Sequence, residues 1–265
     1  MQNSSQSDPN ADLVLWYPKP AGEWLEALSI GNGRLGAMVF GGVPEERLQL
    51  NESTLWAGGP HCYDNPAALE AFPEVRRLVF AGEWQAAQDL ANDKCMGLPM
   101  NQMPYQPAGD LVLTMADSGD VTDYRRELDL NTAIARTTYQ AGGMTFHREV
   151  FASAPDQVIV ARFTADKPGS LAFHMNLNSP QQSITAANGP NTLILSGKSG
   201  DNKGIVGSVG FAILARVQTD GHVEAISGDQ LVVTGAREAT ILVSIATSYQ
   251  SYRDVGGDVG GLATA

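Results

Sequence analysis

Short runs in which apolar and polar residues alternate strictly restrict the fold of this chain more than any other feature. In LAFHMNLN at 171–178, every second residue from Leu171 is apolar. Successive side chains of a strand point to opposite faces, so this period of two predicts a half-buried β-strand. GFAILARVQ at 210–218 and TILVSIATS at 240–248 repeat the pattern. We expect one inter-sheet core to contain Phe173, Met175, Phe211, Ile213, Val243 and Ile245.

Similar runs fill most of the chain. Turn signals separate them, such as AGG at 141–143 and KPGS at 167–170, and the 28 glycines and 14 prolines agree with many turns. This many short strands in 265 residues predict a mainly β protein, a large two-sheet sandwich. The other predicted strands lie near 34–40, 45–50, 109–115, 124–130, 133–140, 143–152, 157–165, 191–197 and 230–234.

A two-helix insertion near residues 66–94 interrupts the strand pattern. Pro73 suits the first turn of one helix, and Ala81-Gly82 separates it from a second. The apolar positions that we expect to pack are Val75, Leu78 and Val79 in the first helix and Trp84, Ala87, Leu90 and Ala91 in the second.

The two ends of the chain lack a core pattern. Residues 1–12, MQNSSQSDPNAD, are polar and contain no apolar segment of a signal peptide. We expect 1–12 to be disordered, 13–255 to form the sandwich domain, and the glycine-rich 256–265 to be a linker. Localisation stays open: cytoplasmic, or periplasmic or secreted if a signal peptide has been removed.

The net charge of −12 argues against two classes of partner. Phosphate backbones and anionic membranes repel an acidic surface, so we expect neither nucleic-acid nor membrane binding. The chain also lacks the run of about 18 apolar residues that a membrane-spanning helix needs. The histidines show no metal-ligand spacing, and Cys62 and Cys95 fit no zinc motif. We expect no metal and no cofactor, and either two free thiols or one disulfide.

The segment NESTLWAGGP at 51–60 places an amide, a carboxylate, two hydroxyls and an indole ring close together, a combination that a folding element does not need. Buried polar groups without partners cost about 1–3 kcal/mol each, and a tryptophan is unfavourable in water. We therefore interpret it as a domain-docking or substrate-proximal loop. Its candidate residues are Asn51, Glu52, Thr54 and Trp56. The alternative is a local turn in which Trp56 covers the domain's own core.

A search for catalytic groups finds no site. Glycoside hydrolysis needs two carboxyl groups flanking the scissile bond, and Glu52, Asp64 and Glu149 are candidates by composition alone. No spacing places two of them across a cleft. The chain has no G-x-S-x-G motif, and the glycines at 31, 33 and 36 lack the strand–loop–helix context of a phosphate loop.

Longer segments carry a specific resemblance. Residues 15–60, which include IGNGRLGAMVFGG and LNESTLWAGGP, resemble the start of glycoside hydrolase family 95, the inverting α-L-fucosidases. MPYQPAGDLVL at 103–113 resembles the family's YQPLGDL segment, with Ala108 where leucine is usual. TSYQSYRDV at 247–255 resembles the end of its first domain. The resemblance covers residues 13–255.

This resemblance implies an N-terminal β-supersandwich that is followed by an (α/α)6 catalytic barrel in the same polypeptide. In that family the barrel supplies a glutamic acid, and an asparagine oriented by an aspartate that activates water. No residue here matches those positions, so this chain alone is expected to be inactive. Residues 256–265 would lead toward the barrel. The parent enzyme would remove terminal α-1,2-linked L-fucose from glycans with inversion.

Two other functions stay open at this stage. One is a free-standing carbohydrate-binding β-sandwich module, which would bind a glycan by itself. The other is a supersandwich epimerase, which would need its own acid–base pair facing a pocket.

Overall fold

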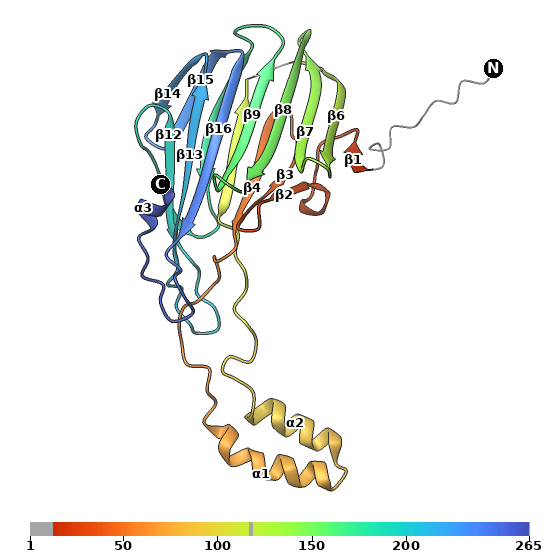
Figure 1. Cartoon of the computed structure of the whole chain (residues 1–265), viewed down its shortest axis with the longest axis vertical. Helices are drawn as coiled ribbons and strands as arrows, with labels where there is room; N and C mark the ends of the chain where they lie inside the picture. Colours follow the sequence, from red (N-terminus) through yellow and green to blue (C-terminus); the bar gives the residue numbers. More distant parts are fainter. Residues whose placement is uncertain (1–12, 117–118, 265) are drawn as a thin grey trace, which may run out of the picture.

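The computed structural model describes residues 13–116 and 119–264. Figure 1 shows two β-sheets packed face to face, with every strand pair antiparallel. The predicted two-sheet sandwich is therefore confirmed. The predicted disorder of residues 1–12 lies outside the described residues.

One sheet has nine strands and the other has seven. The nine-stranded sheet runs, in spatial order, β1 (Val14–Tyr17), β6 (Val121–Asp129), β7 (Ile134–Ala141), β8 (Met144–Ser153), β9 (Val158–Ala165), β16 (Glu238–Thr247), β13 (Gly210–Thr219), β12 (Thr192–Lys198) and β11 (Gln182–Ala187). The seven-stranded sheet runs β14 (His222–Ile226), β15 (Gln230–Ala236), β10 (Leu171–Asn178), β5 (Gly109–Met115), β4 (Glu45–Glu52), β3 (Leu35–Val39) and β2 (Leu28–Gly31).

The core lies between the two sheets, where the apolar side chains of the alternating strands meet. In the nine-stranded sheet Ile213 is paired with Ile245, and both side chains are fully buried. Across the sandwich, the Phe163 ring of β9 lies 5.9 Å from the Phe173 ring of β10. The six core residues predicted from the sequence all belong to this one cluster.

A buried ion pair joins the sheets beside this core. Arg148 of β8 donates from Nη1 to Glu46 Oε2 of β4 at 2.9 Å, and the two side chains are 3% and 1% exposed. Arg148 also donates to the Gly42 and Val43 carbonyls and to the Tyr139 hydroxyl. Desolvation raises the pKa of the Glu46 carboxyl, and the Arg148 charge opposes that shift. The guanidinium thus has hydrogen-bond acceptors in place of water.

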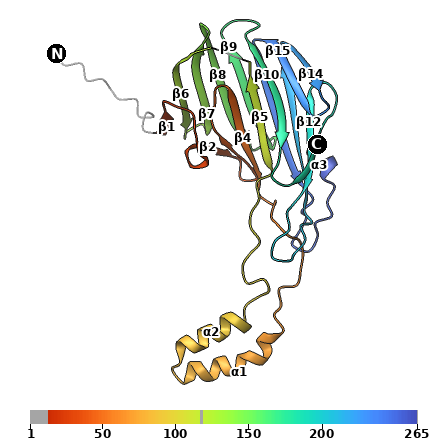
Figure 2. The ribbon, with the colours of Figure 1, turned by 180° about the vertical axis from the view of Figure 1, so that it is seen from behind.

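The predicted insertion forms a helical hairpin, α1 (Ala67–Phe80) and α2 (Trp84–Lys94). Figures 1 and 2 show that it stands away from the sandwich on two extended segments. Pro73 lies inside α1, seven residues into the helix, so its predicted place in the first turn was wrong. The helix starts earlier because Asn65 accepts a hydrogen bond from the Ala67 N–H ahead of it.

Residues 256–265, predicted as a linker, contain a short helix, α3 (Val259–Thr264). Val259 packs on Ala212 of β13 and Ala246 of β16, on the outer side of the nine-stranded sheet. None of the helices in the described ranges has the length and apolar character needed to cross a bilayer.

Candidate functional site

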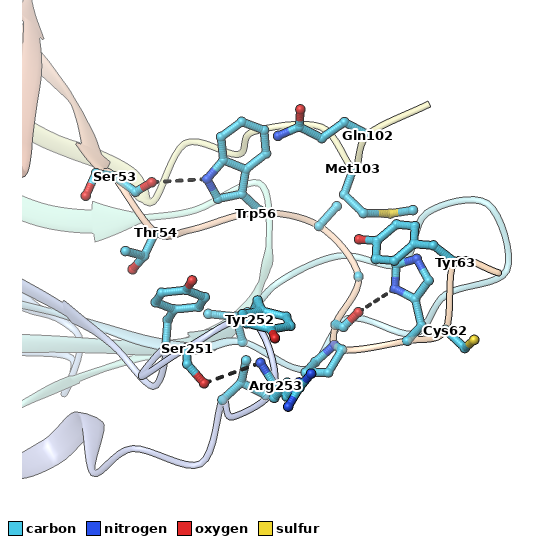
Figure 3. Close-up of a pocket in the computed structure, with 18 of the residues that line it drawn as sticks. Ser53, Thr54, Trp56, Cys62, Tyr63, Gln102, Met103, Ser251, Tyr252 and Arg253 are labelled. Carbon is cyan, nitrogen blue, oxygen red and sulfur yellow. Dashed lines mark hydrogen bonds between the residues drawn. The ribbon is translucent and has the colours of Figure 1, made fainter. Parts of the chain in front are cut away.

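A groove of about 770 Å³ opens at the end of the sandwich where the 51–60 segment leaves β4. We call it the Trp56 groove. One wall is residues 53–64 with Gln102 and Met103, and the other is Val209 with residues of the 249–255 loop (Figure 3). Segments that are far apart in the sequence therefore meet in one concave surface.

Glu52 lies behind the Trp56 groove and is bonded within the domain. Its side chain is 3% exposed, and Oε2 accepts hydrogen bonds from the Thr54 N–H at 2.7 Å and the Thr54 hydroxyl at 2.6 Å. Arg34 Nη1 lies 3.5 Å from Glu52 Oε1 and donates to the Ile245 carbonyl at 2.8 Å. The Thr54 hydroxyl is also hydrogen-bonded to that of Thr247. Glu52 and Thr54 therefore tie the end of β4 to β16 of the other sheet.

Trp56 is half-buried at the rim, and two contacts fix its ring. The indole Nε1 donates to the Ser53 carbonyl at 3.0 Å, and the Tyr105 ring packs edge-on with centroids 5.3 Å apart (Figure 3 shows the first contact). Tyr105 in turn donates its hydroxyl proton to the Glu52 carbonyl at 2.9 Å. Burial, followed by the Glu52 charge, raises the pKa of the Tyr105 hydroxyl. The Trp56 ring is therefore held as a rigid apolar surface, and its N–H already has a hydrogen-bond partner.

Gly58 and Gly59 allow the backbone to approach the 199–208 loop. The Gly58 N–H donates to the Gly200 carbonyl at 2.9 Å, and the Ser208 N–H donates to the Gly58 carbonyl at 3.0 Å. A Cβ on Gly59 would lie 1.9 Å from Ser208 Oγ. Gly58 has a φ of +71°, which disfavours other residues. The Gly-Gly-Pro turn is therefore explained by contacts inside this domain.

The 249–255 loop supplies the opposite wall with aromatic rings. Tyr249 and Tyr252 are exposed, and the Arg253 guanidinium lies 5.0 Å from the centroid of the Tyr252 ring. Neither tyrosine is among the site candidates predicted from the sequence. The signal was present in SYQSYRD, where aromatic and polar residues mix with no alternation.

His61 adds a polar group to the first wall. Its Nδ1 lies 2.7 Å from the Gly59 carbonyl, an acceptor for an Nδ1–H. The ring lies 3.9 Å from the Tyr63 ring. The opposite nitrogen, Nε2, is buried and has no hydrogen-bond partner among the described residues. In a neutral ring, an Nδ1–H bonded to the Gly59 carbonyl leaves Nε2 as an acceptor.

The carboxylates considered for catalysis do not come together. Glu149 lies on the outer face of the nine-stranded sheet, where Arg136 Nε contacts it at 3.0 Å, and Glu52 is enclosed as described. Asp64 is the single carboxylate among the described residues that line the Trp56 groove. Asn51 is half-buried opposite Gly36 in the strand pair and lies outside the lining. The volume and aromatic lining of the Trp56 groove are those of a ligand pocket, but one carboxylate does not make the pair that glycoside hydrolysis uses.

Metal and thiol chemistry have little support in the described ranges. There, His, Cys, Asp and Glu side chains form no group of three that could hold a metal ion. Cys62, at the rim of the Trp56 groove, and Cys95, at the end of α2, are free thiols.

The model of the glycosyl hydrolase family 65 N-terminal domain matches residues 15–252. The chain belongs to this domain family. The hairpin, nearly all of the strand pattern and most of the residues that line the Trp56 groove fall within the matched residues. The predicted resemblance to the N-terminal domain of α-L-fucosidases is also confirmed by curated relatives.

Two of these relatives are α-fucosidases. Alpha-L-fucosidase 2 of Arabidopsis thaliana is 36% identical over 266 residues, which cover 91% of this chain and 31% of the relative. The probable alpha-fucosidase A of Aspergillus niger is 26% identical over 235 residues, which cover 85% of this chain and 29% of the relative. The glycosyl hydrolase family 65 N-terminal domain described here therefore spans about a third of the length of the curated relatives it matches.

One solved structure has the same fold. A putative kojibiose phosphorylase from the human microbiome superposes with a TM-score of 0.54 at 8% identity, covering 94% of this chain and 33% of its own. At this identity the similarity concerns the fold of the family 65 N-terminal domain.

Proposed function

We propose that this chain is the non-catalytic N-terminal domain of a larger α-L-fucosidase that removes terminal α-1,2-linked L-fucose from glycans with inversion. The match to a third of alpha-L-fucosidase 2 supports the parent enzyme. One observation carries the non-catalytic role: Asp64 is the single carboxylate lining the Trp56 groove among the described residues. Inverting hydrolysis needs a second group, at roughly 6.5–9.5 Å from the first, to activate water.

In this proposal the remaining part of the enzyme supplies the (α/α)6 barrel, and residues 13–255 form one sandwich domain beside it. The Trp56 groove faces the barrel or the glycan held there. Trp56 serves as the rigid surface, while Glu52 and Thr54 hold the loop that presents it. Asn51 precedes this loop near the end of β4.

The experiment that tests this function compares the longer polypeptide with the isolated chain on an α-1,2-linked fucosyl disaccharide. Proton NMR during early turnover should show β-L-fucose as the first product of the longer polypeptide, and no hydrolysis by residues 1–265 alone. Release of α-L-fucose would contradict inversion. Hydrolysis by the isolated chain would contradict the non-catalytic role, and its loss in Glu52→Gln or Glu149→Gln would name the missed group.

A second candidate is a free-standing carbohydrate-binding module. The observation that favours it is the set of aromatic side chains around the Trp56 groove, namely Trp56, Tyr63, Tyr249 and Tyr252. Aromatic rings with polar neighbours suit the apolar faces and hydroxyls of sugars. Calorimetric titration of the isolated chain with fucosylated oligosaccharides separates the two: saturable binding that Trp56→Ala abolishes would favour the module.

A further inference from the structure

The α1–α2 hairpin has apolar residues on two opposite faces of α1. On one face Ala71, Val75 and Leu78 recur at helical spacing, and Leu78 is 7% exposed. This face packs on α2, where Ala87 is buried. The opposite face carries Leu69, Phe72 and Phe80, which are 84%, 55% and 84% exposed. Residues three, four, seven and eleven apart share a helix face, so these side chains form one stripe.

The exposed stripe is large for a protein surface. Trp84, at the start of α2, adds a ring that is 66% exposed. An aromatic side chain carries roughly 150–250 Å², so the three rings Phe72, Phe80 and Trp84 alone leave on the order of 400 Å² of apolar surface in water. Single patches on monomers reach about 300–600 Å² and are often functional. The leucines of the hairpin add to this area.

The neck of the hairpin connects this stripe to the Trp56 groove. The two neck segments are hydrogen-bonded to each other, from the Leu98 N–H to the Tyr63 carbonyl at 3.0 Å and from Asn65 Nδ2 to the Met96 carbonyl at 3.0 Å. Residues 60–64 of the neck also line the Trp56 groove. The hairpin is therefore an arm that continues one wall of the groove (Figures 1 and 2).

We propose that the exposed stripe of α1, with Trp84, docks in an apolar furrow on the remaining part of the same polypeptide, and that the furrow carries a carboxylate facing Arg76. This inference rests on the proposed function, which supplies the further polypeptide. The curated relatives are about three times as long as their matched region, and the family match includes the hairpin. A domain on the same chain binds at a high effective concentration, so a surface of this size suffices.

The charges on α1 favour this partner over a second copy of the chain. Arg77 is already paired with Glu74 at 2.8 Å and with Glu83 at 3.6 Å. Arg76 lies within the stripe, between Phe72 and Phe80, and makes none of the ion pairs found among the described residues. In a two-fold contact between two hairpins, Arg76 would approach its own copy, and like charges would meet. An acidic partner surface meets no such repulsion.

Hydrogen–deuterium exchange of the α1 amides, in the longer polypeptide and in the isolated chain, tests the docking. We expect exchange to be slower by about tenfold or more in the longer polypeptide. Leu69→Ser with Phe80→Ser should remove that protection. Ile184→Ser is the matched control, because Ile184 is 78% exposed on the edge strand β11, far from the hairpin. In the longer polypeptide, Arg76→Glu should speed the exchange of the α1 amides, and Arg76→Lys should leave it unchanged.

Three results would overturn the docking. One is equal exchange of α1 in the two proteins, and another is protection that survives the double serine variant. The third is protection that rises with protein concentration, which would identify a second copy as the partner. Fucosidase activity is measured in a separate assay. If the α1 amides are protected in a longer polypeptide that hydrolyses no fucoside, the proposed function is contradicted and the docking is not.

Discussion

Glu46 and Arg148 connect the two sheets of this domain through a hydrogen-bonded ion pair of 2.9 Å with almost no access to water. Removing one partner leaves the other charge buried. We expect Glu46→Ala and Arg148→Met each to lower the free energy of unfolding by about 3–5 kcal/mol. The double variant should cost clearly less than the sum of the two. Urea denaturation of the four proteins in a double-mutant cycle measures this coupling, and additive losses would refute it.

Ile245 and Ile184 give a matched comparison of core and edge. Ile245→Ala should cost about 2–5 kcal/mol, because its side chain is fully buried opposite Ile213. Ile184→Ala removes the same atoms from a side chain that is 78% exposed, and should change stability by less than about 0.5 kcal/mol. Equal shifts of the denaturation midpoint would contradict the assignment of the core.

Gly59 and Ser208 test the close approach behind the Trp56 groove. Gly59→Ala would bring a methyl group 1.9 Å from Ser208 Oγ, and overpacking of this kind costs about 1–3 kcal/mol. Ser208→Gly should be tolerated and should rescue Gly59→Ala, since it removes the atoms that clash. Thermal melting of the two single variants and the double variant decides this. A double variant no more stable than Gly59→Ala would show that the backbone, and not the serine, is the obstacle.

Acid sensitivity should arise partly from Asp220. Its Oδ1 accepts hydrogen bonds from the Glu238 and Arg237 N–H groups at 2.9 Å each, and these bonds hold the pKa of Asp220 below its usual value of 3.8. A lowered folded-state pKa gives stability that is present above pH 3.8 and is lost as the pH falls through the folded pKa. Asp220→Asn should therefore show a smaller drop in the urea midpoint on acidification than the wild type. Equal drops of the urea midpoint in Asp220→Asn and in the wild type would contradict this role of Asp220.

Trp56 and Asn51 test the Trp56 groove in the longer polypeptide. Trp56→Ala should lower its fucosidase activity or the stability of its catalytic part, with little effect on the melting of the isolated chain, because the ring lies at the rim. Asn51→Ala should lower the same activity or stability. Trp56→Phe keeps an aromatic ring and should therefore retain part of the wild-type activity. Melting of the isolated domain together with unchanged kinetics of the longer polypeptide would identify the segment as purely structural.

The sequence predicted the interior strands of both sheets well. The strands it missed are β1, β11, β14 and β2, which are the outermost strands of the two sheets. An outermost strand has one neighbour and is short or partly exposed on both faces; β11, for example, has no buried residue. The β11 pattern therefore lacks the apolar face from which a strand is predicted, whereas β2 buries Leu28 and Ile30 but is only four residues long. Pro73 misled the helix prediction because the first turns of α1 contain alanines, exposed apolar residues and Glu70, with no regular apolar stripe.

The sequence likewise indicated only some of the residues around the Trp56 groove. Trp56 stood out because a tryptophan among polar residues is unusual in a strand end. The local role of Glu52 could not be read from the sequence, because its partner Arg34 lies in the β2–β3 turn and Thr247, which contacts Thr54, lies in β16. Tyr249 and Tyr252 reach the Trp56 groove only through the register of β16 with β13.

The position of β16 has a consequence for how the domain folds as it is synthesised. Among the described residues this strand is the last of the two sheets in sequence order, yet it lies in the middle of the nine-stranded sheet, between β9 and β13. Until residues 238–247 leave the ribosome, β9 and β13 each present an unpaired inner edge. Contacts between such distant segments form slowly, and open strand edges are prone to pair with other chains. The nascent domain should therefore depend on chaperone protection until its final strand inserts and closes the sheet.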